Sequence, residues 1–285
     1  MKQQHVTSVS ASEAVAEGPI FSTSDTSPAP ESAEFQSIAQ ARTILLLGED
    51  GVERLKKSHV MVVGCGAVGG MAIEALARTG VGKITVVDFD CFSPSNLNRQ
   101  ILATIPTIGI DKTEVACQRI AQINPTITVI QKQLCVNANT IDSLFNESPD
   151  FVIDAIDSLN PKTTLIEALI NRHIPFISAM GAALKTDLTR IKIAPMKKTI
   201  QCPLAAFVRK RLRRRGIDLS FPVVYSDECV SDKAHLGAPD EESNRHTMGS
   251  IITVTGIFGL MCAHFAIQHI INQSSLQDTT QDTTQ

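Results

Sequence analysis

Tryptophan is absent from this 285-residue sequence, and a single tyrosine accompanies eleven phenylalanines. Proteins that bind single-stranded nucleic acid on stacking platforms use several aromatic side chains. The scarcity of such residues argues against a binding surface of that kind. Hydrophobic residues, at 43%, and charged residues, at 19%, lie close to the values of globular proteins, which excludes a wholly disordered chain.

Paired cysteines with the spacing C-x-x-C are missing. The seven cysteines lie scattered at positions 65, 91, 117, 135, 202, 229 and 262. This pattern matches neither a disulfide framework nor a zinc ribbon, and it predicts reduced thiols in a cytoplasmic protein. No apolar run follows a positively charged start, so a secretory signal is not expected. Repeats with a period of roughly 20–50 residues are also missing, which excludes solenoids and propellers.

The net charge of −3 is unevenly distributed. Because residues 1–40 carry −4 and residues 272–285 carry −2, the stretch between them carries +3. Residues 1–36 are rich in Ser, Thr, Ala, Glu and Pro, and the last residues read QDTTQDTTQ. Such compositions cannot build a core, so we expect disordered tails over 1–36 and 272–285 and a folded body over 37–271.

Strand-like runs and helical runs alternate through the body. The expected strands are 59–63, 83–87, 127–131, 151–155, 174–178 and 189–194, and the expected helices are 67–79, 111–123, 139–146 and 161–173. This alternation predicts an α/β fold with a Rossmann-like, mainly parallel sheet and helices on both faces. Residues 181–248 are less regular, and we expect an antiparallel extension there that forms the substrate region.

The most apolar segment is 249–267, which carries no formal charge over 19 residues and is long enough to span a bilayer. Small residues interrupt it, His264 lies within it, and Gln268 and His269 follow. We therefore predict a buried or dimer-interface apolar helix over 249–271. Membrane association through 249–267 is the alternative.

A glycine-rich turn, Gly64-Cys65-Gly66-Ala67-Val68-Gly69, stands between the first expected strand and the first expected helix. In this context Gly64 makes the tight turn, Gly66 lets the backbone approach a phosphate, and Gly69 allows the helix to pack closely on the strand. The free N–H groups that open the helix then face the anion. Asp88 ends the second strand, where an acidic residue commonly binds a ribose hydroxyl.

The loop after Asp88 holds more polar groups than a dinucleotide site requires. Asp90, Asn96, Asn98, Arg99 and Gln100 follow closely, Lys112 opens the next helix, and Asp157 follows the strand 151–155. Because the carboxyl ends of parallel strands share one edge of a sheet, we expect these residues to lie together. Arg99 and Lys112 can neutralise phosphates, and Asp157 can hold Mg²⁺ with phosphate oxygens in its shell. The sequence therefore predicts a nucleoside triphosphate site with Arg99, Lys112 and Asp157 as its catalytic residues.

Five motifs in order resemble the adenylating domain shared by ubiquitin-activating enzymes, MoeB and ThiF: VVGCGAVGG, VVDFD, SNLNRQ, DKTE and DAIDS, within residues 41–180. The resemblance implies that ATP activates a carboxylate as an acyl-adenylate. It implies that Asp88 binds the ribose, that Asn96, Arg99 and Lys112 contact the phosphates, and that Asp157 holds magnesium. Arg42 matches the arginine that family members send into the partner subunit's nucleotide, which implies a homodimer.

The second half of the chain resembles one branch of that superfamily. MoeB and ThiF carry paired C-x-x-C zinc motifs there, and this chain has none. The stretches VIDAIDSLNPKTTLIEALINRHIP and KTIQCPLAAFVRKRLRRRGI instead resemble the tRNA threonylcarbamoyladenosine dehydratases, over residues 36–271. The resemblance implies ATP-dependent cyclisation of threonylcarbamoyladenosine beside the tRNA anticodon. It leaves open a monovalent cation in addition to ATP and Mg²⁺.

Six of the seven residues at 209–215 are basic, namely Arg209, Lys210, Arg211, Arg213, Arg214 and Arg215. In a body of only +3 this run is a concentrated patch that can bind a phosphate backbone without reading its sequence. A tRNA substrate would account for it directly. A solvated helix face is the alternative.

Two other functions compete with an RNA-modifying enzyme. An adenylyltransferase for a sulfur-carrier or ubiquitin-like protein is one, and zinc-binding cysteines would be expected in it. A non-catalytic scaffold for a cysteine desulfurase or another sulfur-acceptor partner is the other. A scaffold would not need Arg99, Lys112 and Asp157 together, so we favour an adenylate-forming enzyme that acts on tRNA.

Overall fold

The computed structural model describes residues 28–230, 236–239 and 246–272. Most of both expected tails, 1–27 and 273–285, lies outside the described residues. The first helix, α1 (Ala33–Lys57), begins inside the expected N-terminal tail, because Ser32 caps it by accepting a hydrogen bond from the backbone N–H of Phe35. The boundary expected at residue 36 is therefore too late by about one helical turn. Gly48, with φ of 74°, breaks α1 into two arms.

Seven strands form one sheet in the order β3-β2-β1-β4-β5-β7-β6. Their bounds are β1 (His59–Val63), β2 (Lys83–Asp88), β3 (Thr128–Gln133), β4 (Phe151–Asp154), β5 (Phe176–Ala179), β6 (Ile191–Pro195) and β7 (Pro222–Ser226). All pairs are parallel except β6 with β7. Strands β8 (Leu236–Pro239) and β9 (His246–Met248) form a separate antiparallel pair. The mainly parallel sheet and the antiparallel extension are both confirmed.

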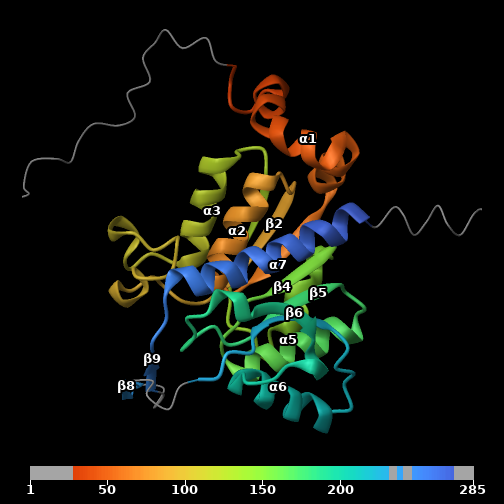
Figure 1. Ribbon diagram of the computed structural model, residues 1–285. Coiled ribbons are helices and arrows are strands. Elements are labelled where there is room, and N and C mark those ends of the chain that lie inside the picture. Colours follow the sequence, from red (N-terminus) through yellow and green to blue (C-terminus); the bar gives the residue numbers. More distant parts are fainter. Residues whose placement is uncertain (1–27, 231–235, 240–245, 273–285) are drawn as a thin grey trace, which may run out of the picture.

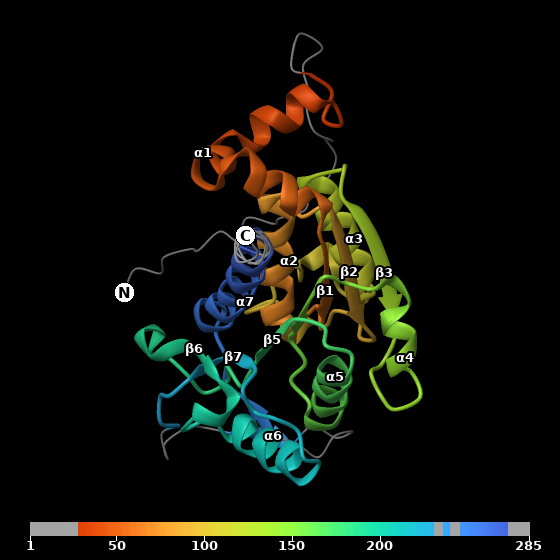
Figure 2. The same cartoon turned by 90° about the vertical axis from the view of Figure 1, so that its right-hand side faces the viewer.

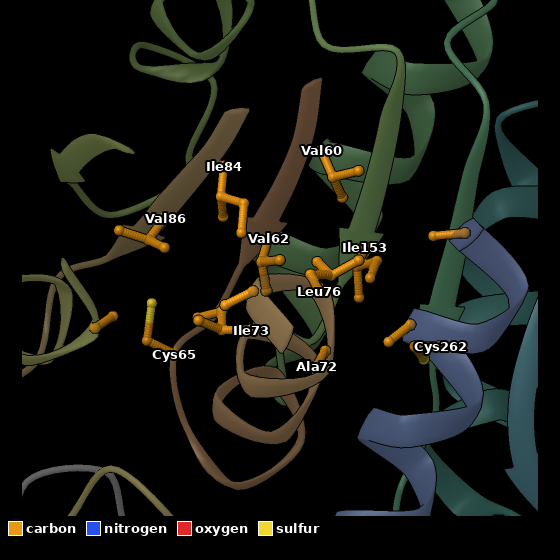
Figure 3. Close-up of a cluster of buried hydrophobic side chains, with 14 of the residues drawn as sticks. Val60, Val62, Cys65, Ala72, Ile73, Leu76, Ile84, Val86, Ile153 and Cys262 are labelled. Atoms are coloured by element: carbon orange, nitrogen blue, oxygen red, sulfur yellow. The ribbon is translucent and has the colours of Figure 1, made fainter. Parts of the chain in front are cut away.

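Helices cover both faces of this sheet (Figures 1 and 2). One face carries α2 (Ala67–Thr79), α3 (Lys112–Ile123) and α7 (Ile252–Asn272), and the other carries α4 (Ile141–Leu144), α5 (Leu159–Asn171) and α6 (Pro203–Arg214). Strand side chains alternate between the faces, as the pleat requires. Val60 and Val62 pack toward α2, and Figure 3 shows Val62 beside Ile73 and Leu76 of that helix. Met61 and Val63 belong to the core under α5 and α6.

The apolar segment near the C-terminus is a core helix. Within α7, Val254, Phe258, Cys262, Ala266 and Ile270 are buried, and the helix lies along α2. By length and composition α7 would also be able to cross a membrane, but 56% of its apolar window is buried inside the fold. Its glycines serve close packing: a Cβ on Gly259 would stand 2.3 Å from the backbone oxygen of Val68 in α2. The predicted buried helix is confirmed, with bounds shifted to Ile252–Asn272.

The strand order reverses at β1. Strands β2 and β3 extend the sheet on one side of β1, and β4 and β5 extend it on the other. In open α/β sheets, the crevice outside the carboxyl ends of the strands at such a reversal is where ligands bind. The glycine-rich turn follows β1, and the segment that contains Asp157 follows β4. The topology therefore places both at this crevice.

Candidate functional site

The glycine-rich turn leaves no room for side chains at two of its positions. Gly64 has φ of 98°, and a Cβ there would stand 2.9 Å from the carbonyl oxygen of Ala155. A Cβ on Gly69 would stand 1.6 Å from the carbonyl oxygen of Gly64. Gly66 caps α2 without any side-chain hydrogen bond, so the first N–H groups of the helix are left for an anion. The turn has the shape and the donors that a phosphate requires.

Gln100 lies beside this turn with an unsatisfied polar atom. Its side chain is 3.9 Å from the point where a Cβ on Gly66 would stand, and its buried Oε1 has no hydrogen-bond partner. An unpaired buried polar atom costs on the order of 1–3 kcal/mol. Both ends of the Gln100 amide can contact a nucleotide, because the oxygen accepts a hydrogen bond from a hydroxyl and the NH₂ donates one to a phosphate. These residues therefore fit ATP at this edge of the sheet.

Asp88 joins the turn to the loop that follows β2. Its Oδ2 accepts from the backbone N–H of Cys65 at 2.6 Å, and its Oδ1 accepts from those of Phe89 at 2.8 Å and Asp90 at 3.0 Å. A carboxylate has capacity for one further hydrogen bond, so this geometry is compatible with the expected contact to ribose. Burial and the neighbouring Asp88 raise the pKa of the Cys65 thiol, which therefore stays protonated.

Lys112 is held at the start of α3. Its Nζ lies 3.0 Å from Oδ2 of Asp90, and its backbone N–H donates to the carbonyl oxygen of Asp90 at 2.9 Å. The Lys112 side chain is only 9% exposed, with its ammonium 6.0 Å from the centre of the Phe92 ring. Asp90 thus positions the charge of Lys112, and Asp90 and Lys112 do come together as the sequence predicts.

Asn96 and Arg99 shape the same loop. The buried Asn96 accepts from the backbone N–H of Ser93 at 3.2 Å. Arg99 is half-buried and donates to the carbonyl oxygen of Ser95 at 2.9 Å and to Oδ1 of Asn98 at 3.0 Å. Its guanidinium therefore lies along its own loop, with donors left over for a phosphate.

Asp157 is the exposed residue of the segment 155–158 between β4 and α5. This segment starts beside the glycine-rich turn, since Ala155 donates its backbone N–H to the carbonyl oxygen of Val63 at 2.9 Å. Among residues 28–230, 236–239 and 246–272, no three His, Cys, Asp or Glu side chains cluster as a metal site. A lone carboxylate still suits Mg²⁺, which keeps several waters and takes phosphate oxygens as ligands.

A buried ion pair under this segment escaped the sequence analysis. Lys162 donates to Oδ2 of Asp154 at 2.7 Å, both side chains are fully buried, and Ser178 donates to the same oxygen at 2.6 Å. Oδ1 of Asp154 accepts from the backbone N–H of Ile156 at 3.1 Å, which fixes the turn that leads to Asp157. The sequence does show a charged residue, Asp154, at the end of an apolar strand. It does not show that Lys162 lies next to it in the fold.

Arg42 lies far from the rest of the site in the same chain. It is exposed on α1, where the nearby Gln40 donates to the carbonyl oxygen of Arg78 at 3.2 Å. Arg78 is at the far end of α2 from the glycine-rich turn, and a helix of 13 residues is about 20 Å long. Any contact of Arg42 with a nucleotide therefore requires a second copy of the chain.

The structure divides the basic run of α6. Arg209 donates to the carbonyl oxygen of Thr199 at 2.8 Å, and Arg213 is exposed on another face of the helix. The other four basic residues line a groove together with two apolar residues: Leu159, Phe207, Lys210, Arg211, Arg214 and Arg215. The run is therefore not one uniform surface, since two of its members lie outside the groove.

Comparison with known proteins agrees with this geometry. The model of the ThiF family matches residues 40–284. A tRNA threonylcarbamoyladenosine dehydratase of Bacillus subtilis (strain 168) is 44% identical, over 66% of this chain and 74% of the relative. The enzyme of that name from Escherichia coli (strain K12) is 35% identical, over 82% of this chain and 94% of the relative. The crystal structure of E. coli TcdA, the same dehydratase, in complex with ATP superposes with a TM-score of 0.78 at 33% identity, covering 87% of this chain and 99% of that one. The chain therefore belongs to the ThiF family.

Proposed function

We propose that this protein is an ATP-dependent tRNA threonylcarbamoyladenosine dehydratase, which activates the carboxylate of the modified adenosine beside the anticodon and closes it into a ring. The observation that carries the proposal is the meeting of the glycine-rich turn, Lys112 and the Asp157 segment at one sheet edge. The similarity to dehydratases over most of the chain supports the choice of substrate. The reaction is ligase-like, because it consumes ATP to make an acyl-adenylate.

The chain's residues would divide the work as follows. The N–H groups at the start of α2, with Arg99 and Lys112, bind the phosphates, and Asp88 binds the ribose. Asp157 holds Mg²⁺, which neutralises charge on the phosphates. Attack of the substrate carboxylate on the α-phosphorus releases pyrophosphate. A nitrogen or oxygen of the carbamoyl group then attacks the activated carbon and AMP departs with one carboxylate oxygen, so the substrate loses one water.

Ring closure is intramolecular, and a well-placed neighbour reaches effective molarities on the order of 10⁵ M. Positioning therefore suffices for the second step, and no cysteine nucleophile is needed. Cys202 is buried at the start of α6, and Cys229 is exposed with its Sγ 3.6 Å from Oε1 of Gln201. We assign neither of them a chemical role.

A second copy of the chain would complete the site. Ile38, Leu45 and Leu46 on the first arm of α1 are 64%, 87% and 82% exposed, and the arm extends away from the sheet (Figures 1 and 2). Burying these side chains in a homodimer would bring Arg42 to a partner's nucleotide. A homodimer in the cytoplasm is the assembly that we propose.

The alternative is adenylation of a sulfur-carrier or ubiquitin-like protein, and the paired zinc-binding cysteines expected for it are absent from this sequence. Incubation of the purified protein with ATP, Mg²⁺ and tRNA that carries threonylcarbamoyladenosine separates the two. Nucleoside mass spectrometry should detect loss of one water from the modified adenosine, and only when ATP is present. Deletion of the gene should leave the uncyclised nucleoside in cellular tRNA. The dehydratase function would be excluded if the purified protein left the modified adenosine uncyclised and if deletion of the gene left the cyclic nucleoside in cellular tRNA.

A further inference from the structure

The groove between α5 and α6 combines positive charge with an exposed aromatic ring. It has a volume of about 360 Å³, and its lining is Leu159, Phe207, Lys210, Arg211, Arg214 and Arg215. Four of the six are basic. Phe207 is 59% exposed, an unusual position for one of the few aromatic residues of this chain. Residues three, four and seven positions apart share one face of a helix, so Phe207, Lys210, Arg211 and Arg214 project from α6 together.

The cations of this groove are only partly neutralised. Arg215 pairs with Glu167 at 2.6 Å, and Arg211 donates to Oδ1 of Asn160. Within the described part of the chain, the side chains of Lys210 and Arg214 have neither an ion pair nor a hydrogen bond. Two free positive charges beside an aromatic face are the combination with which proteins bind single-stranded nucleic acid, the charges meeting phosphates and the ring stacking on a base.

The groove adjoins the nucleotide site through the chain itself. Leu159, in its lining, is two residues after Asp157, and Asn160, which holds Arg211, is three residues after it. Two residues of extended chain span at most about 7 Å. A nucleotide bound in the groove would therefore lie a short distance along the RNA from a modified adenosine placed at the ATP site.

We propose that this groove binds a nucleotide of the tRNA anticodon arm that flanks the modified adenosine, with its base stacked on Phe207 and its phosphate between Lys210 and Arg214. The proposal rests on the dehydratase function, because that function makes an unpaired loop of RNA the substrate. An acidic peptide would match the charge but would gain nothing from the ring of Phe207. The scarcity of aromatic residues excludes a long stacking platform, but a single base requires only one ring.

Three variants test the groove, and all alter exposed side chains, so the fold should stay intact by thermal unfolding. Phe207→Leu keeps the apolar contact and removes the aromatic face. Arg214→Gln removes one charge from the groove. Arg213→Gln is the matched control, because it removes the same charge from α6 outside the groove. The probes are bulk tRNA and a single-stranded RNA pentamer with 2-aminopurine at its centre.

Phe207→Leu should weaken pentamer binding by roughly five-fold or more and abolish the change in 2-aminopurine fluorescence. Arg214→Gln should lower the slope of log affinity against log salt by about 0.7, while Arg213→Gln leaves it near wild type. Equal losses for Arg214→Gln and Arg213→Gln, or no effect of Phe207→Leu, would overturn the groove assignment. So would binding of polyglutamate that depends equally on Phe207. Dehydration of modified tRNA, measured separately, reports whether the proposed function itself holds.

Discussion

Lys162 and Asp154 form an ion pair of 2.7 Å from which water is entirely excluded. Removing one partner of a buried pair leaves an uncompensated charge, which costs roughly 3–5 kcal/mol. We therefore expect Lys162→Met to lower the free energy of unfolding by about that amount in urea denaturation. The surface variant Lys57→Met, which breaks the exposed pair with Glu53, is the control and should lose much less stability.

A double variant tests the cause of this loss. Asp154→Asn combined with Lys162→Met removes both charges and keeps a polar group for Ser178 and for the backbone N–H of Ile156. It should recover part of the stability that Lys162→Met loses. If the double variant were as unstable as the sum of the two single variants, the uncompensated charge would not be the cause.

Asp157→Asn should abolish magnesium-dependent ATP turnover and leave the melting temperature unchanged, because Asp157 is exposed. Asn keeps the shape but offers Mg²⁺ a neutral oxygen in place of a carboxylate. Asp142→Asn, at an exposed position of α4, is a control with the same change of charge. The measurement is pyrophosphate release against magnesium concentration. Full activity of Asp157→Asn with an unaltered magnesium requirement would remove Asp157 from the site.

Gly259→Ala should disturb both stability and nucleotide binding. The added Cβ would stand 2.3 Å from the backbone oxygen of Val68 and 2.9 Å from Cβ of Met71. Relief of this overlap moves α7 away from the first turn of α2, at a cost of roughly 1–3 kcal/mol. Gly256→Ala meets only the flexible end of Met71, at 3.1 Å, and should cost less. Calorimetric melting and ATP titration check both variants, and equal melting temperatures would contradict the packing argument.

Glu74 should make stability depend on pH in the acid range. Burial opposes its ionisation, but hydrogen bonds from Arg119 and Arg78 outweigh burial and lower its pKa from the ordinary 4.5. Because the folded pKa is the lower one, the stabilisation is complete above pH 4.5 and is lost as pH falls through the folded value. At neutral pH, Glu74→Gln should therefore cost roughly 1–3 kcal/mol, with the difference from wild type shrinking in acid.

The control for Glu74 is Glu53→Gln, which breaks an exposed pair with Lys57 on α1 and should change stability by less than about 0.5 kcal/mol. Urea unfolding at pH 7 and at several points below pH 4.5 makes the comparison. A constant difference between wild type and Glu74→Gln across this range would show that the carboxylate charge is not what stabilises the contact of α2 with α3.

Local pattern was sufficient for six strands of the sheet and for the glycine-rich turn, but β7 was not among the expected strands. The β-branched run at 59–63 and the alanine-rich stretch at 67–79 match β1 and α2 residue for residue, because each is bounded by glycine or by a sharp change of period. Helix α1 was not predicted, since the pattern of its two arms, broken at Gly48, has no sustained period. Helix α6 was not among the expected helices either, because the basic run dominated that stretch.

The sequence by itself determined the alternation of strands and helices between residues 59 and 178, the glycine-rich turn and the residues that can contact phosphates, because those depend on neighbours along the chain. Only the tertiary structure decided which charged side chains have partners within the fold and which do not. It buried Lys162 against Asp154, tied Arg209 to Thr199, and left Lys210 and Arg214 beside Phe207. Such pairings join residues from different elements, and the energy of a charge depends on its partner and its exposure to water, neither of which is written in local sequence.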